Sequence, residues 1–240
     1  MKLYRALQAQ GFGSRKQSIA YVRAGMIEVN GELCEDPETE VDPVGLELTL
    51  DGLTLPYREK AYVLMHKPAG HECSHQPSHH PSVFTLLPPP FIQRGVQCVG
   101  RLDQDTTGLL LFSDDGQFLH RMTSPKKGVA KVYRAVCADP VNEAMLDALR
   151  SGVQLNDEPA PIAALACEQS DTHTLRLTLR EGKYHQVKRM IGATGNRVTA
   201  LHREAIGDFV MPESLPPGTW CWLTETDMKQ LEQPWRSVTS

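Results

Sequence analysis

The chain has 240 residues, of which 40% are hydrophobic and 22% charged, and its formal net charge is −4. This composition is typical of a globular protein of one or two domains and excludes a collagen-like, coiled-coil or disordered chain. No apolar run approaches the roughly 18 residues of a membrane helix, and the first ten residues lack the apolar core of a signal peptide. We therefore expect a cytoplasmic protein without a membrane partner.

The six cysteines are scattered along the chain without a Cys-x-x-Cys pair. This pattern favours reduced thiols over a disulfide framework or a zinc knuckle. The positions are Cys34, Cys73, Cys98, Cys137, Cys167 and Cys221.

The charge is unevenly distributed, although the negative total by itself argues against binding to nucleic acid. Residues 1–23 contain five basic and no acidic residues, residues 24–59 contain ten acidic residues and one basic residue, and residues 176–203 contain seven basic residues and one acidic residue. Two basic segments on an acidic chain can attract a polyanion locally. Two solvated faces would give the same pattern, so charge alone leaves both interpretations open.

The first elements in chain order are two short helices. Leu3, Ala6 and Leu7 form an apolar stripe that ends at the glycines of residues 11–13. Ser14 followed by Gln17 is a capping box, which predicts a second helix with Ile19 and Val22 on its buried face and an end at Gly25.

A hairpin follows the second helix. Asn30-Gly31 favours a type I′ turn between short strands at residues 27–29 and 32–33. A further strand is predicted at residues 46–50, before a proline-containing stretch at residues 55–59. We place a domain boundary there, which gives a first domain of residues 1–59 and a second of residues 60–240.

The order helix, capped basic helix and Val-Asn-Gly hairpin resembles the S4 RNA-binding domain. The residues that carry this resemblance are Gly13-Ser14-Arg15-Lys16 and Gly25-Met26-Ile27-Glu28-Val29-Asn30-Gly31. The resemblance implies that Arg15, Lys16 and Arg23 contact RNA phosphates.

The second domain mixes strands with short helices. Strands are predicted at residues 62–65, 109–112, 131–137 and 175–179, and helices around residues 118–122, 145–149 and 187–191. Because the strands come in runs without regular alternation with helices, we predict an α+β domain. Residues 71–98 are rich in His and Pro and predict a long loop. The spacing of the His and Cys residues in this loop fits no zinc pattern, so a polar surface loop is favoured over a metal site.

The densest group of reactive side chains is Gly100-Arg101-Leu102-Asp103-Gln104-Asp105-Thr106-Thr107-Gly108, directly before a buried strand. A loop at the rim of a sheet can project side chains into a cleft. Asp and Thr also stabilise ordinary turns, and two carboxylates could hold Mg²⁺ or act as glycosidase acid and base. Spacing alone does not choose between these possibilities.

The same loop resembles the active-site motif of the pseudouridine synthases of the branch named after ribosomal small-subunit pseudouridine synthase A. Further matching stretches span most of the chain: Lys67-Pro68-Ala69-Gly70, Ser113-Asp114-Asp115-Gly116, Lys131-Val132-Tyr133, Glu181 to Met190, and Leu201-His202-Arg203-Glu204. The resemblance implies a pseudouridine synthase domain built on a largely antiparallel mixed sheet with flanking helices.

Carried over by position, the resemblance implies that Asp103 is the catalytic aspartate, that Tyr133 stacks on the target base and that Lys188 pairs with the aspartate. Asp105 and Thr106 match loop-shaping positions. The remaining expected RNA contacts are Arg101, Lys183, Arg189 and Arg203.

The implied reaction is the isomerisation of one uridine in 16S rRNA, with no cofactor and no metal. The expected substrate is a partly assembled 30S particle, and the expected enzyme is a monomer. Two other interpretations stay open: a synthase acting on 23S rRNA, and a non-catalytic RNA-binding assembly factor of the same fold. A carboxylate-dependent hydrolase would instead depend on a metal or release uracil.

Overall fold

The computed structural model describes residues 1–124 and 126–233, so residue 125 and residues 234–240 of the predicted second domain lie outside the described residues. The chain divides into two compact units. The first contains residues 1–61, 87–97 and 113–115, and the second contains the rest. The predicted division at residues 59 and 60 differs from this one because two later segments pack with the first unit. Within the described part of the chain, no helix is both long enough and apolar enough to cross a membrane.

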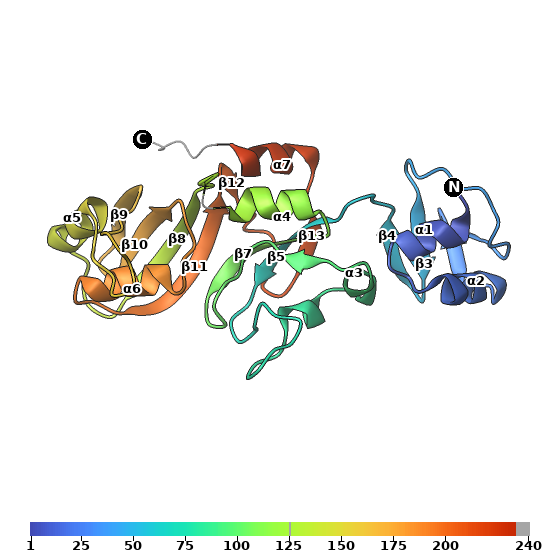
Figure 1. The fold of residues 1–240 in the computed structure, drawn as a ribbon. Coiled ribbons are helices and arrows are strands. Elements are labelled where there is room, and N and C mark those ends of the chain that lie inside the picture. The colour runs from blue at the N-terminus through green and yellow to red at the C-terminus, as the bar shows by residue number, and fades with distance from the viewer. Residues whose placement is uncertain (125, 234–240) are drawn as a thin grey trace. The chain divides into compact units, whose positions relative to one another are not determined.

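The first unit combines short helices with a four-stranded sheet (Figure 1). Its helices are α1 (Leu3–Ala9), α2 (Arg15–Arg23) and α3 (Pro89–Gln93). The strands pair antiparallel in the order β2-β1-β3-β4. Their bounds are β1 (Ile27–Val29), β2 (Glu32–Leu33), β3 (Glu47–Leu50) and β4 (Leu53–Pro56).

Local signals in the sequence determine where these elements begin and end. The Ser14 Oγ accepts a hydrogen bond from the Gln17 backbone N–H at 3.3 Å, and the Gln17 side chain accepts one from the Ser14 N–H at 2.9 Å, which confirms the capping box. Asn30 and Gly31 have φ values of 52° and 82°, as a type I′ turn requires. Val22 is buried as predicted, whereas Ile19 is only partly buried and Ser18 takes the inner position.

Arg94 ties the later segments into the first unit. Its Nε donates to Asp114 Oδ2 at 2.7 Å, and its Nη1 donates to Gln10 Oε1 at 2.9 Å. Gly11 has a φ of 82°, and a side chain there would meet the Pro90 carbonyl oxygen at 2.0 Å. The first unit is therefore assembled from segments that lie far apart in the sequence.

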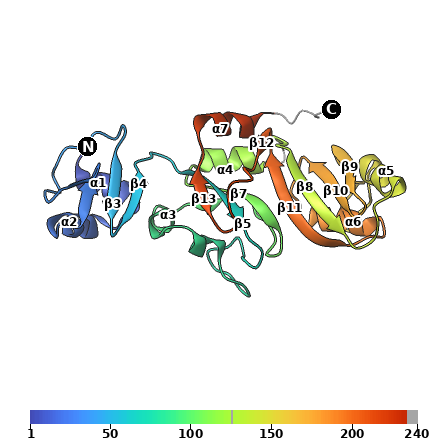
Figure 2. The same ribbon diagram turned by 180° about the vertical axis from the view of Figure 1, so that it is seen from behind.

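The second unit is built around a mixed sheet of nine strands. Its main path is β13-β5-β7-β11-β8-β10-β9, with β12 paired to β11 and β6 paired to β7 (Figure 2). β11 runs parallel to β7, while β8, β10 and β9 are antiparallel to their neighbours, which confirms the predicted α+β class with a mixed sheet. The bounds are β5 (Tyr62–Lys67), β6 (Gln97–Cys98), β7 (Thr107–Ser113), β8 (Lys131–Cys137), β9 (Ala166–Asp171), β10 (Thr174–Leu179), β11 (Val198–Ile206), β12 (Phe209–Val210) and β13 (Trp220–Trp222).

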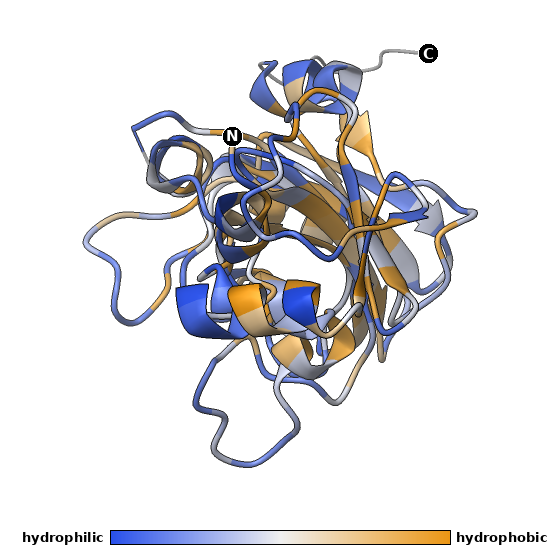
Figure 3. Cartoon of the chain, turned by 90° about the vertical axis from the view of Figure 1, so that its right-hand side faces the viewer, coloured by the Kyte–Doolittle hydropathy of each residue, from blue (hydrophilic) through white to orange (hydrophobic). Residues whose placement is uncertain are grey.

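The helices of this unit bury their apolar faces against the sheet and against each other. They are α4 (Gly116–Thr123), α5 (Glu143–Ser151), α6 (Gln186–Ala193) and α7 (Glu225–Glu232), together with a 3-10 turn at Val83–Leu86. α4 and α7 lie side by side in Figures 1 and 2, and Phe118, Met122 and Leu231 join one core cluster with Leu109 and Leu111. Hydrophobic residues accordingly concentrate on the strands, and hydrophilic residues on the loops (Figure 3).

One sequence prediction was wrong in detail, and one long strand was missed. Residues 71–98 are not one long loop, because they contain the turn at Val83–Leu86, α3 and β6. The long strand β11 was not predicted, although it pairs with β7, β8 and β12. Its inward-facing positions include Arg203, which hides the apolar alternation of a strand.

A fully buried lysine anchors the loop that precedes β7. Lys67, at the end of β5, has no exposed surface and donates hydrogen bonds to the carbonyl oxygens of Pro68 at 3.0 Å, Gln104 at 3.0 Å and Thr106 at 2.9 Å. Burial lowers the pKa of its ammonium group. Next to this loop, β7 approaches β11 so closely that a side chain at Gly108 would meet the Arg203 carbonyl oxygen at 2.3 Å.

Replacing Lys67 with Met should lower the free energy of unfolding by about 1–3 kcal/mol, because buried carbonyl groups lose their donor. Chemical denaturation would measure this decrease. Lys60→Met is the matched control, since Lys60 is exposed and its replacement should change stability by less than about 0.5 kcal/mol. Equal stability of the two variants would contradict the anchoring role.

Candidate active site

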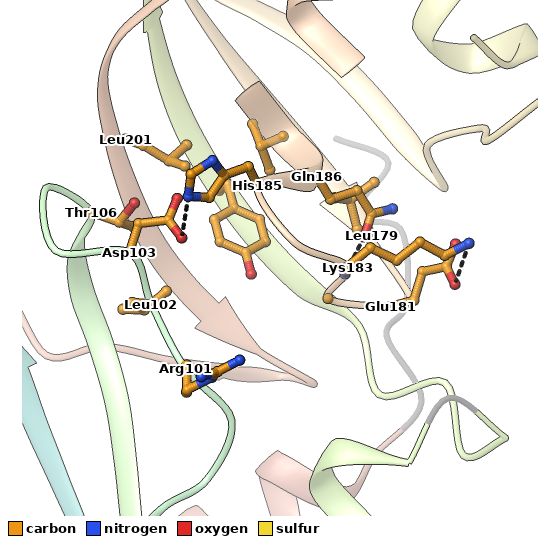
Figure 4. Close-up of a pocket in the computed structure, with 13 residues that line it drawn as sticks. Arg101, Leu102, Asp103, Thr106, Leu179, Glu181, Lys183, His185, Gln186 and Leu201 are labelled. Atoms are coloured by element: carbon orange, nitrogen blue, oxygen red, sulfur yellow. Dashed lines mark hydrogen bonds and ion pairs between the residues drawn. The ribbon is translucent and has the colours of Figure 1, made fainter. Parts of the chain in front are cut away.

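The loop between β6 and β7 carries Asp103 on the wall of a cavity of about 60 Å³ (Figure 4). A backbone hydrogen bond from Thr106 N–H to the Asp103 carbonyl oxygen, at 3.1 Å, closes the turn that contains it. The Asp103 side chain is 26% exposed. The loop therefore offers a carboxylate that is partly withdrawn from water but still reachable from the cavity.

Lys188 on α6 forms ion pairs with both carboxylates of the loop. Its Nζ lies 3.0 Å from Asp103 Oδ2 and 2.7 Å from Asp105 Oδ1. The sequence-based interpretation paired Lys188 with Asp103 and gave Asp105 a loop-shaping position; in the structure Asp105 also shares the ammonium group. Lys188 is 25% exposed and Asp105 is 54% exposed, so Asp105 is the outer partner.

The ion pairs shift the pKa values of Lys188 and Asp105. Burial opposes the charge of Lys188, but the hydrogen bonds that Lys188 donates to Asp105 and Asp103 outweigh it and raise the Lys188 pKa. Burial also opposes the ionisation of Asp105, and the hydrogen bond and charge of Lys188 outweigh it and lower the Asp105 pKa. The ammonium group of Lys188 is therefore held charged beside two carboxylates.

His185 is a member of this group that the sequence analysis did not select. Its Nε2 lies 3.3 Å from Asp103 Oδ1, and Figure 4 shows the two side chains facing each other. His185 has a φ of 48° at the start of α6, and its ring stacks on Tyr184 at a centroid distance of 3.8 Å. The available signal was its position three residues before Lys188, which is one helical turn.

Tyr133 forms part of the wall of the same cavity. It lies on β8, in register with Leu177 of β10 and Arg203 of β11, and is 7% exposed. Leu179 and Leu201 also line the cavity. A flat aromatic side chain beside a carboxylate, with apolar neighbours, can accept a planar base by stacking.

The expected RNA contacts differ in their exposure and in their ion-pair partners. Arg101 is exposed and lines the cavity with Asp103. In the first unit, Arg15, Lys16 and Arg23 are exposed on α2, and the Arg15 guanidinium lies 5.2 Å from the centre of the Tyr4 ring. These four residues are accessible to a phosphate group in solution.

Two further expected contacts are held by acidic side chains. Lys183 pairs with Glu158, and its Nζ lies 3.6 Å from Glu181 Oε2. The Arg189 Nη2 lies 3.3 Å from Asp157 Oδ2. Either residue must exchange its acidic partner to contact a phosphate directly.

Arg203, which is also among the expected RNA contacts, has a buried side chain. It is 2% exposed, and its Nε donates to the Leu109 carbonyl oxygen at 2.8 Å, so it does not lie on the outer surface. Its Nη2 is also buried and has no hydrogen-bond partner among the described residues. Successive side chains of a strand point to opposite faces of the sheet, and Arg203 lies on the buried face of β11 between the partly exposed His202 and Glu204.

The histidine-rich loop is organised around the Glu72 carboxylate. The Glu72 carboxylate accepts hydrogen bonds from the backbone N–H groups of Ser78, His79 and His80 at 2.8–2.9 Å. These bonds lower the pKa of Glu72 to about 2. Among the described residues, no group of three or more His, Cys, Asp or Glu side chains is arranged to hold a metal ion.

Comparisons with known proteins show the family to which the chain belongs. Residues 61–193 match the family model for RNA pseudouridylate synthase. A Vibrio parahaemolyticus protein named ribosomal small subunit pseudouridine synthase A is 39% identical over 90% of this chain and 92% of its own length. A Bacillus subtilis protein named uncharacterized RNA pseudouridine synthase YtzG is 37% identical over 98% of this chain and 99% of its own length.

Among solved structures, a crystal structure of pseudouridylate synthase superimposes with a TM-score of 0.68 at 35% sequence identity, over 96% of this chain and 99% of the other. The family model covers more than half of this chain, and relatives above 30% identity cover nearly all of it. The chain therefore belongs to the RNA pseudouridylate synthase family.

Proposed function

We propose that this RNA pseudouridine synthase converts one uridine of 16S rRNA to pseudouridine and that Asp103 is its catalytic carboxylate. The observation that carries the proposal is the Asp103 carboxylate on a cavity wall, 3.0 Å from the Lys188 ammonium group and in the same lining as Tyr133. The small-subunit target is supported by relatives of 39% and 37% identity that are named ribosomal small subunit pseudouridine synthase A.

The reaction breaks the bond between N1 of uracil and C1′ of the ribose, turns the base, and forms a bond between C5 and C1′. The proton displaced from C5 is balanced by one gained at N1, so no external electrons are needed. Two roles for Asp103 fit this scheme: a nucleophile at C1′, or a base that removes a proton from the ribose. Both roles require the carboxylate to be ionised at the moment when it attacks C1′ or accepts the ribose proton.

The neighbouring side chains support the proposed chemistry. An ammonium group at hydrogen-bond distance stabilises a carboxylate that is partly withdrawn from water. We assign to Lys188 the role of the ammonium group beside the carboxylate. To Tyr133 we assign the role of stacking on the flipped-out uracil. Leu179 and Leu201 would restrict water around the cleaved sugar.

The first unit is proposed to be an S4-like RNA-binding module that precedes the catalytic domain. Its support is the basic, exposed face of α2, with Arg15, Lys16 and Arg23, and the Asn30-Gly31 hairpin. The proposed substrate is a partly assembled 30S particle, since an accessible, unpaired uridine is easier to extract than a stacked one. We propose that the enzyme acts as a monomer without a cofactor.

Asp103→Asn should fold and bind RNA but lose turnover by at least about 10²–10⁴-fold, because the amide carries no negative charge. Pseudouridine formation on unmodified 16S rRNA particles would measure this decrease. Asp157→Asn, which removes an 84% exposed carboxylate, is the control and should retain turnover. An active Asp103→Asn enzyme would exclude the catalytic assignment. A wild-type protein that binds rRNA without turnover would favour an assembly factor.

Deleting the gene should remove one pseudouridine from 16S rRNA and leave 23S rRNA unchanged. Carbodiimide mapping of rRNA from cells with and without the gene measures both molecules in one experiment. Disappearance of a 23S site instead would reject the small-subunit target while keeping the enzymatic activity.

Arg15→Ala combined with Lys16→Ala should weaken RNA binding and flatten its salt dependence. The logarithmic slope should fall by about 0.7–0.9 for each phosphate that the protein no longer neutralises. Filter binding across a range of salt concentrations would measure both effects. Arg58→Ala with Lys60→Ala is the matched control, because it removes the same charge from exposed positions outside α2. Equal behaviour of the two double variants would reject the RNA-binding role of α2.

A further inference from the structure

A second cavity, of about 90 Å³, adjoins the one that contains Asp103. The two share Arg101, Tyr133 and Gly182 in their linings, and the second is completed by Lys131, Arg203 and Thr123 among others. Its volume is several times the roughly 10–15 Å³ that one water molecule needs, so it has room for a group of several atoms.

The charged groups of this second cavity are cations without an anionic partner in its lining. Arg203 is almost completely buried, and its Nε is used by the Leu109 carbonyl oxygen while its Nη2 has no partner among the described residues. The Lys131 Nζ donates to the Val129 carbonyl oxygen at 2.9 Å. None of the described residues that line the cavity is acidic.

This arrangement is unfavourable when the cavity holds only water. Burial, and secondarily the charge of Arg203, lower the pKa of Lys131 to about 8. A buried guanidinium with a free N–H and a neighbouring ammonium lack the counter-charge that buried cations usually have. An oxyanion would supply that charge and accept the free hydrogen bonds together.

We propose that the cavity lined by Lys131, Arg203 and Arg101 binds a phosphate group, and that this group is the phosphodiester directly next to the target uridine. The inference rests on the proposed function, because it takes RNA as the occupant of the adjoining cavity. Tyr133 lines both cavities, so a base against its ring and a phosphate in the second cavity could belong to adjacent parts of one strand. Lys131 and Arg203 thus act as substrate-binding residues that position the nucleotide beside Asp103.

Lys131→Met should raise KM for unmodified rRNA by about 10- to 100-fold, the range for one charge-assisted hydrogen bond, with a smaller change in kcat. Arg134→Met is the matched control. Arg134 lies on the same strand but on the opposite face, exposed and paired with Glu204 at 3.1 Å, so its replacement should leave KM within about twofold. The melting temperature of Lys131→Met should not fall below that of the wild type, because the substitution removes a buried positive charge next to Arg203. Equal KM values for the two variants would overturn the inference.

The source of the phosphate is tested with the wild-type enzyme and synthetic RNA substrates. A neutral methylphosphonate is placed on one or the other side of the target uridine. At one of these two positions only, it should reduce the kcat/KM of the wild type by about the factor that Lys131→Met causes. The same methylphosphonate should cause no further decrease in Lys131→Met. Uniform small effects at every position would reject the phosphodiester.

Inorganic phosphate provides a readout that does not depend on activity. At constant ionic strength it should raise the melting temperature of the wild-type protein and of Arg134→Met, but not of Lys131→Met. A shift that is equal in all three proteins would reject the anion site. A Lys131-dependent shift without any methylphosphonate effect would mean that the cavity takes free phosphate, which overturns the RNA assignment. Absence of turnover in the wild type would instead count against the proposed function.

Discussion

The ion pair between Asp103 and Lys188 joins the two parts of the chain from which the candidate active site is built. The loop before β7 supplies the carboxylate, and the first turns of α6 supply the ammonium group at 3.0 Å. Both side chains are about three-quarters buried, so their charges are screened less by solvent than those of a surface pair. The interaction places an ammonium group and a carboxylate together on the wall of the cavity, where a substrate can reach them.

Two buried cations near this site differ in how fully their N–H groups are hydrogen-bonded. Lys67 has no exposed surface, but its three hydrogen bonds go to backbone carbonyl oxygens and fix the loop that carries Asp103. Arg203 is almost as deeply buried, yet its Nη2 is left without a partner among the described residues. A satisfied cation rigidifies a loop, whereas an unsatisfied one favours an anionic ligand.

Much of the local structure could be predicted from the sequence because its signals act over a few residues. The capping box at Ser14, the hairpin at Asn30-Gly31 and the strand and helix periodicities all appear in the structure near their predicted bounds. The prediction failed at two features. β11 carries Arg203 inward, and residues 71–98 contain short elements without clear periodicity. Neither feature has the apolar alternation on which such predictions depend.

For the candidate site, the motif around Asp103 and the positions of Tyr133 and Lys188 could be selected from the sequence by resemblance. The sequence could not reveal that Asp105 shares Lys188, that His185 lies 3.3 Å from Asp103, or that Lys183 and Arg189 already have acidic partners. The sequence by itself determined the elements and the family motifs, since these depend on residue types at short spacing. Only the tertiary structure decided which charges meet and which are buried, because both depend on contacts between segments that are distant in the chain.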